Sequence, residues 1–139
     1  MKFEVETEIS RTPAEAFDKM ADVRNETRWN SQVSRSELTS DEPVREGSVF
    51  TTVNRGKEYN ATISTYDRPR RLAFDVTGKP MDITATFSFE PNGEGTVLKG
   101  EFDMRPKGVL KAIFPVMKPV IRKDLAKHSQ SFKDFCEAS

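Results

Sequence analysis

The first residues of the chain alternate between apolar and charged side chains. In "FEVETEI" (residues 3–9) the apolar positions and Thr7 fall on one side, and acidic residues fall on the other. A period of two predicts a β-strand with one face in water. The next residues change character: Thr12 is a good N-cap, Pro13 suits the first position of a helix, and Glu15 completes a capping box. We expect a short helix here, and a second short helical turn from Asp22 toward Trp29.

Six further runs with strand character follow, separated by turn signals. They span residues 31–39, 48–54, 58–67, 71–78, 81–90 and 96–104. The clearest is 81–90, where apolar and polar residues alternate throughout, and Asn92-Gly93 after it is a strong hairpin signal. Because every linker is short, the pattern predicts an antiparallel meander of six or seven strands.

The period changes again after Gly108. Apolar residues and one histidine recur three or four positions apart, at Leu110, Phe114, Met117, Ile121, Leu125, His128, Phe132 and Phe135. This spacing predicts one face of a long helix. Pro115 and Pro119 each remove a backbone donor and crowd the preceding turn. We therefore expect the final helix to begin near Pro119 and reach at least Phe132, with an irregular segment or a separate short helix before Lys118.

This arrangement predicts an internal cavity. A sheet with one wet face must cover its other face, and one helix covers a strip only about 10 Å wide. A curved sheet wrapped around the final helix would close the gap and leave a space lined by phenylalanine and methionine side chains. We expect the apolar stretch "GVLKAIFPVMKPVI" (108–121) to border that space and to be one of the more mobile parts of the fold.

Composition and charge narrow the class of protein. The chain has 139 residues and no formal net charge, which fits one soluble globular domain, 1–139. Its charge is uneven, since residues 105–133 hold eight Lys/Arg and one acid. Such a basic segment suggests contact with an anionic membrane surface or a nucleic acid, but inward-facing aromatic residues disfavour nucleic acid. The single cysteine and the lack of an apolar leader at the N-terminus predict a cytoplasmic protein.

The order of the elements resembles the START-like superfamily, which includes the Bet v 1 allergens and the polyketide cyclase/dehydrase and lipid transport (SRPBCC) proteins. The resemblance covers essentially the whole chain and is carried by "TPAEAFDKMAD" with Trp29 after it, "REGSVF", "YDRPRRLAFDV", "FSFEPNGEGTVLKGEF" and the closing amphipathic helix. The small bacterial polyketide-cyclase-like members are the most similar. The resemblance implies an α+β helix-grip fold, with two short helices after the first strand and a curved antiparallel sheet around a long C-terminal helix. It implies a ligand pocket and no shared catalytic triad.

The side of its strand or helix on which each residue falls identifies candidate binding and catalytic residues. We expect the cavity to be lined by Trp29, Tyr59, Phe74, Phe87, Phe102, Met104, Phe114, Met117, Ile121 and His128. His128 is the one candidate for acid–base chemistry, since it lies on the apolar face of the helix. Asp75, Asp82, Glu101 and Asp103 are out of phase with their apolar neighbours, so we expect no inward-facing pair of carboxylates. One histidine and one cysteine do not make a Cys/His zinc site, and we expect no metal or cofactor.

Three hypotheses for the function remain open. The leading one is binding or transport of a small hydrophobic molecule, lipid-like or polyketide-like, between the sheet and the C-terminal helix. The alternative is a cyclase- or hydratase-type enzyme that uses His128 and a tyrosine in the same cavity. The third is an adaptor that presents its basic C-terminal helix to a partner or transiently to a membrane surface.

Overall fold

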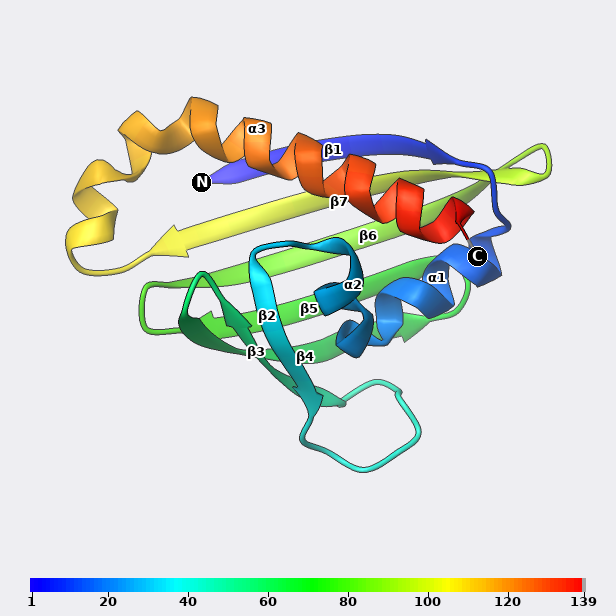
Figure 1. Ribbon diagram of the computed structural model, residues 1–139, viewed down its shortest axis with the longest axis horizontal. Helices are drawn as coiled ribbons and strands as arrows, with labels where there is room; N and C mark the ends of the chain where they lie inside the picture. The colour runs from blue at the N-terminus through cyan, green and yellow to red at the C-terminus, as the bar shows by residue number, and fades with distance from the viewer. Residues whose placement is uncertain (139) are drawn as a thin grey trace.

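The computed structural model describes residues 1–138 and consists of one antiparallel sheet covered by helices (Figure 1). The elements are β1 (Lys2–Ile9), α1 (Pro13–Ala21), the 3-10 turn η1 (Val23–Asn25), α2 (Glu26–Trp29), β2 (Val33–Leu38), β3 (Val49–Asn54), β4 (Lys57–Asp67), β5 (Arg71–Gly78), β6 (Met81–Asn92), β7 (Gly95–Pro106) and α3 (Val109–Glu137).

The sheet has seven strands in the order β1-β7-β6-β5-β4-β3-β2, and each neighbouring pair is antiparallel. The six strands after α2 form the expected meander, and β1 pairs with the last of them. Figure 1 shows α3 crossing the curved sheet beside β1, while α1 and α2 lie over the sheet next to the C-terminal half of α3. The helix-grip architecture predicted from the sequence is confirmed.

The first helix begins where its capping residues predict. The Thr12 hydroxyl accepts a hydrogen bond from the Glu15 N–H at 3.2 Å and donates to the Glu15 carboxylate at 2.9 Å. Asp22 then caps η1, because its carboxylate accepts from the Arg24 N–H at 3.2 Å. These local bonds end α1 and start the two short turns that carry Glu26 and Trp29 over the sheet.

The start of the final helix was predicted wrongly. α3 begins at Val109, ten residues before Pro119, and contains both prolines. Both prolines are exposed, so the carbonyl groups that lose their N–H partners can bond water on the outer side, where the helix bends (Figure 1). On the inner side, Phe114 is 2% exposed and packs in a cluster with Phe3 and Met104. This packing stabilises the first turns of α3 despite the missing hydrogen bonds.

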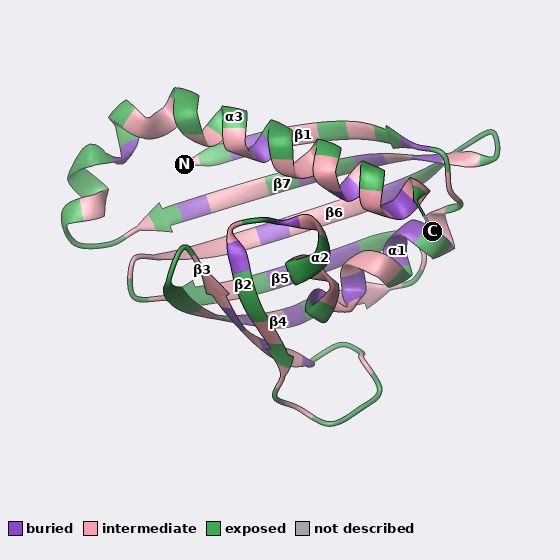
Figure 2. Cartoon of the chain, viewed as in Figure 1, coloured by how far each residue is buried: buried purple, intermediate pink, exposed green. Residues whose placement is uncertain are grey.

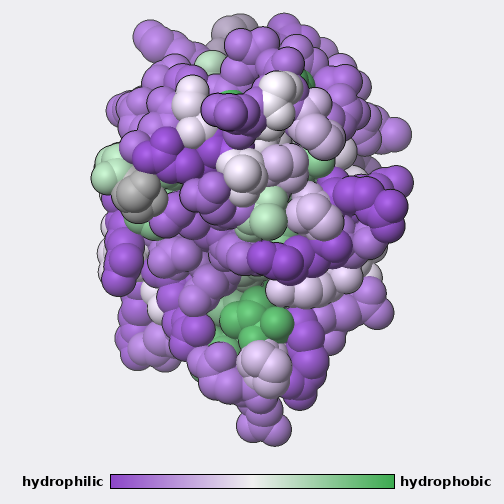
Figure 3. Space-filling model, turned by 90° about the vertical axis from the view of Figure 1, so that its right-hand side faces the viewer, coloured by the Kyte–Doolittle hydropathy of each residue, from purple (hydrophilic) through white to green (hydrophobic). Residues whose placement is uncertain are grey.

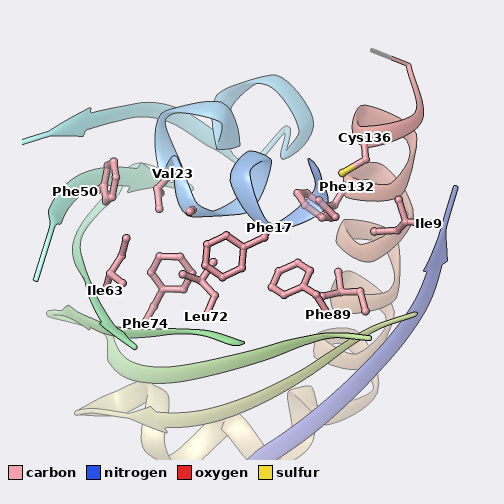
Figure 4. Close-up of a cluster of buried hydrophobic side chains, with 13 residues drawn as sticks. Ile9, Phe17, Val23, Phe50, Ile63, Leu72, Phe74, Phe89, Phe132 and Cys136 are labelled. Atoms are coloured by element: carbon pink, nitrogen blue, oxygen red, sulfur yellow. The ribbon is translucent and has the colours of Figure 1, made fainter. Parts of the chain in front are cut away.

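The core consists of two groups of buried side chains. The larger group joins α1, the middle of the sheet and the C-terminal end of α3, and Figure 4 shows Phe17, Phe89 and Phe132 within it. The smaller group joins β1 and β7 to the earlier part of α3. Figure 2 shows the resulting change along α3, from mostly exposed residues in its first turns to more buried residues near its end.

Candidate functional site

A cavity of about 190 Å³ lies between the sheet, the short helical turns and the C-terminal half of α3. Its wall is mostly apolar, and includes aromatic side chains from three neighbouring strands. The lining residues are Val5, Met20, Asp22, Val23, Glu26, Trp29, Asn30, Ala61, Phe74, Val76, Ala85, Phe87, Leu98, Phe102, Leu125, His128, Ser129 and Phe132. A cavity between sheet and helix is thus present, as the sequence predicts.

Three phenylalanines form the sheet side of the cavity. Phe74, Phe87 and Phe102 come from β5, β6 and β7 and meet edge to face, with ring centroids 6.3 Å apart for the first pair and 5.5 Å for the second. Gly100 makes room for this arrangement, because a Cβ atom there would lie 2.9 Å from Val5 and 3.0 Å from the Phe87 ring. The rings therefore present a rigid apolar surface to the cavity.

The helical side of the cavity is formed by α2 and α3. The rings of Trp29 and Phe132 meet edge to face, with centroids 5.2 Å apart. Leu125, His128 and Phe132 follow the helical spacing predicted for the inner face of α3, and all three line the cavity.

Half of the predicted lining residues are brought together here. Trp29, Phe74, Phe87, Phe102 and His128 line the cavity. Tyr59, Met104, Phe114, Met117 and Ile121 are not part of its lining.

Four of the other five lie on or against the first half of α3, and Tyr59 lies on β4. Met104, Phe114 and Ile121 belong to the smaller apolar cluster, and Tyr59 packs beside Gly78 on the neighbouring strand. The stretch 108–121 therefore does not border the cavity, contrary to expectation. α3 begins earlier than predicted, so these turns extend along the ends of β1 and β7.

Glu26 was not among the predicted site residues. The residue is partly exposed as a whole, but its carboxyl group is buried in the cavity wall, and this desolvation raises its pKa from 4.5 to about 7. A hydrogen bond from Asn30 acts in the opposite direction and limits the rise. The carboxylates weighed from the sequence, Asp75, Asp82, Glu101 and Asp103, all lie on strands. One signal was present: Glu26 is three residues before Trp29, so both share one helix face.

His128 lies in the same cavity wall. Its Nε2 atom is buried and has no hydrogen-bond partner within residues 1–138. Burial lowers the pKa of the imidazole, an effect that Asp124 opposes and that Arg55 and Lys127 reinforce. At neutral pH the ring is therefore mainly uncharged, with one nitrogen as donor and the other as acceptor.

Asp22 also contributes to the lining but is paired. Its carboxylate accepts two hydrogen bonds from the Arg24 guanidinium, at 2.8 and 2.9 Å, and Arg24 also bonds Glu42 at 2.8 Å. The ion pairs raise the pKa of Arg24 further above its ordinary value. Within the described part of the chain, Glu26 and His128 are thus the ionisable lining residues that have no ion pair.

The tyrosine of the enzyme hypothesis is not found in the cavity. Tyr66 packs edge to face on Phe17, with centroids 5.1 Å apart, and neither tyrosine of the chain is among the lining residues. The four carboxylates that were expected to face outward are exposed or form ion pairs. Asp75 and Glu101 are exposed, Asp82 pairs with Lys107 at 2.8 Å, and Asp103 pairs with Arg105 at 3.2 Å.

Comparison with known families agrees with the fold. The family model described as "Polyketide cyclase / dehydrase and lipid transport" matches residues 1–137. The chain belongs to this family. Among curated proteins, no sequence matches it.

Several solved structures have a similar fold. The structure of TTHA0849 from Thermus thermophilus has a TM-score of 0.77 at 16% identity, covering 99% of this chain and 98% of that one. Ara h 8.0201 has a TM-score of 0.74 at 14% identity, covering 100% and 99%. A START superfamily protein from Mycobacterium smegmatis has a TM-score of 0.70 at 13% identity, covering 93% and 97%. At these identities the likeness establishes the fold alone.

Proposed function

We propose that this protein binds and carries a small hydrophobic molecule in the cavity between the sheet and α3. The observation that carries the proposal is the aromatic wall of Phe74, Phe87 and Phe102 facing Trp29 across the cavity. An engineered apolar cavity of about 150 Å³ binds benzene. The cavity of about 190 Å³ therefore fits a ligand with one or two rings, or a segment of a lipid chain.

Membership of the family supports this choice of ligand. Its description joins lipid transport with polyketide cyclisation and dehydration. Lipid chains and the ring systems formed from polyketides are both largely apolar, so both roles use a cavity that removes apolar surface from water. A carrier function requires only that cavity.

Filling the cavity tests the proposal. Ala85 is buried on β6, between Phe74 on β5 and Phe102 on β7 in the strand register, and lines the cavity. Ala85→Leu should weaken binding of naphthalene by about tenfold or more, because the added carbons occupy the ligand's space. Ala112→Leu, on the exposed side of α3, is the matched control and should bind as the wild type does.

Titration followed by amide NMR gives the readout. Naphthalene should shift signals of residues around Phe87 and Leu125 in the wild type and in the control. A thermal melt of Ala85→Leu checks that the variant is folded. If naphthalene and a short-chain alcohol such as octanol leave the wild-type spectrum unchanged, the carrier proposal is wrong.

An enzyme of the cyclase or hydratase type is the second candidate. The observation that favours it is that Glu26 and His128 line one cavity, since Glu26 can hold a proton near neutral pH and the uncharged His128 ring can accept one. The structure gives no support for a tyrosine as the partner of His128. If the protein is an enzyme, Glu26 is the better candidate for that role.

Transient contact with a membrane surface is a further part of the proposal, together with a cytoplasmic location. No helix within the described residues is long and apolar enough to cross a membrane. The first turns of α3, however, expose four large apolar side chains, Val109, Ile113, Val116 and Val120. Val109 and Val116 are 83% and 82% exposed. Lys111, Lys118 and Arg122 lie on the same turns and have no ion-pair partner among residues 1–138.

The positive charges and the exposed apolar side chains together favour binding of this surface to an anionic bilayer. The opposite end of the molecule differs, since Figure 3 shows a face that is largely hydrophilic, with small separate hydrophobic areas. The protein should sediment with vesicles containing phosphatidylserine and much less with phosphatidylcholine vesicles. Val116→Glu should reduce the sedimented fraction, whereas Val97→Glu, on β7, should not. Equal sedimentation of wild type and Val116→Glu would contradict the membrane contact.

A further inference from the structure

The mostly apolar wall of the cavity includes several polar side chains. Glu26 and Asn30 reach the cavity from α2 and its C-terminal end, and His128 and Ser129 reach it from α3. The Ser129 hydroxyl donates its hydrogen to the Leu125 carbonyl at 2.9 Å. The Asn30 side-chain oxygen accepts from the Gln32 N–H at 3.0 Å. Among the ionisable lining groups, Glu26 and His128 have no ion pair, and His128 Nε2 has no hydrogen bond within residues 1–138.

His128 Nε2 is the clearest sign of a missing partner. Buried polar atoms in folded proteins nearly always have a hydrogen bond, and an unpaired one is destabilising. This atom is buried without a partner within residues 1–138 and belongs to a residue of the cavity wall. A bound molecule that places a polar atom there would remove that cost.

We propose that Glu26 and His128 select an apolar ligand that carries one neutral hydroxyl group, an alcohol or a phenol. The inference rests on the proposed function, because it names the ligand class for the same cavity. A hydroxyl group both donates and accepts, so it can bond a carboxyl group or an imidazole nitrogen in either protonation state. A hydrocarbon of the same shape leaves Nε2 unpaired.

Charged ligands fit the site less well. A carboxylate would face the Glu26 carboxyl group, which is itself half ionised near pH 7. An ammonium group would have to leave water for a mostly apolar cavity, where the half-ionised Glu26 carboxyl group supplies only part of a compensating charge. The neutral hydroxyl group avoids both costs.

Four probes with one ring system test this inference. They are naphthalene, 2-naphthol, 2-naphthoate and 1-naphthylmethylammonium, each titrated into the wild-type protein. 2-Naphthol should bind about tenfold more tightly than naphthalene, as expected for one or two buried hydrogen bonds, and more tightly than either charged probe. Glu26→Met and His128→Leu should each lower the affinity for 2-naphthol toward that for naphthalene, and leave the affinity for naphthalene within about threefold. Glu101→Gln, which removes an exposed carboxylate of β7 outside the cavity lining, should keep the preference.

A spectroscopic measurement supplies a readout that mere loss of packing would not produce. His128 is the single histidine, so its side-chain ¹⁵N signals are assigned without ambiguity. 2-Naphthol should shift the Nε2 signal strongly, and naphthalene should shift it little.

The outcomes separate the two proposals. If naphthalene and 2-naphthol bind equally, or if a charged probe binds most tightly, the hydroxyl inference is overturned and the carrier proposal stands. If 2-naphthol binds more tightly but the two variants keep that preference, the role of Glu26 and His128 is overturned. If none of the four probes binds, the carrier proposal fails and the inference fails with it.

Discussion

Asn30 is joined to Glu26 twice, once through the backbone and once through its side chain. The Asn30 N–H donates to the Glu26 carbonyl at 2.9 Å and ends α2, and the Asn30 side chain hydrogen-bonds the Glu26 carboxyl group. Asn30 is itself 4% exposed, and its side-chain oxygen is held by the Gln32 N–H. A rigid amide thus orients a buried carboxyl group toward the cavity. This position of Glu26 should affect the pH dependence of stability and any proton transfer in the cavity.

The stability of the protein should fall as the pH rises through the range in which Glu26 ionises. Burial raises the pKa of Glu26 from 4.5 to about 7, so between these values the folded state holds a proton that the unfolded state has released. Glu26→Gln should therefore increase the free energy of unfolding by about 2 kcal/mol near pH 8, after allowance for partial exposure of the residue. Near pH 4 the substitution should change it little.

Chemical denaturation at the two pH values is the measurement. Glu101→Gln, on an exposed position of β7, controls for the loss of one negative charge. A Glu26→Gln variant that is no more stable at pH 8 than the wild type would show that the carboxyl group is well hydrated.

Substitution of His128 should distinguish binding from catalysis. If the protein is a carrier, His128→Ala should change the affinity for naphthalene by less than about tenfold, because contact area dominates. If it is an enzyme, turnover of its substrate should fall by about a hundredfold or more. A large loss of turnover with unchanged affinity would decide in favour of the enzyme, and Glu26→Gln should then show a comparable loss.

Hydrogen exchange should divide α3 into two parts. Residues 109–118 should exchange faster than 121–132, because Pro115 and Pro119 remove hydrogen bonds and most of these turns are exposed. Bound naphthalene or 2-naphthol should slow exchange chiefly around Leu125 to Phe132, which line the cavity. Exchange measured by mass spectrometry resolves the two parts. Equal protection of both in the unliganded protein would be inconsistent with this division.

A methyl group at Gly100 should reduce the cavity. A Cβ atom there would lie 3.0 Å from Phe87 and 2.9 Å from Val5, and both side chains line the cavity. Gly100→Ala should therefore displace the Phe87 ring, lower the free energy of unfolding by about 1–2 kcal/mol and weaken binding of naphthalene. Gly93→Ala tests a glycine with no close neighbours, where only the positive φ of 62° opposes the change. Unchanged binding by Gly100→Ala would show that the Phe87 ring is free to move.

The pattern of residues predicts the strands well because their faces differ in solvation. In β6, Ala85 and Phe89 are buried, as the period of two requires, and the exposure of Asp75 on β5 follows from the same rule. The inner face of α3 was predicted in the same way, since Phe114, Leu125 and Phe132 are all buried.

The start of α3 and the composition of the cavity wall depended on tertiary structure. Local rules place a helix boundary at Pro119, but the packing of Phe114 against Phe3 and Met104 keeps the earlier turns helical. Met117 and Ile121, which follow these turns, lie outside the cavity lining.

The sequence by itself determined the strand segments and their meander from β2 to β7, the caps of α1 and the apolar face of α3, because each depends on neighbours close in the chain. Only the tertiary structure decided that Glu26, in a helix of one turn, lies beside the aromatic rings of β5, β6 and β7. A single turn has no periodicity from which its buried side can be read. The raised pKa of Glu26 likewise depends on desolvation by residues that are distant in the chain. It therefore depends on the curvature of the sheet around α3.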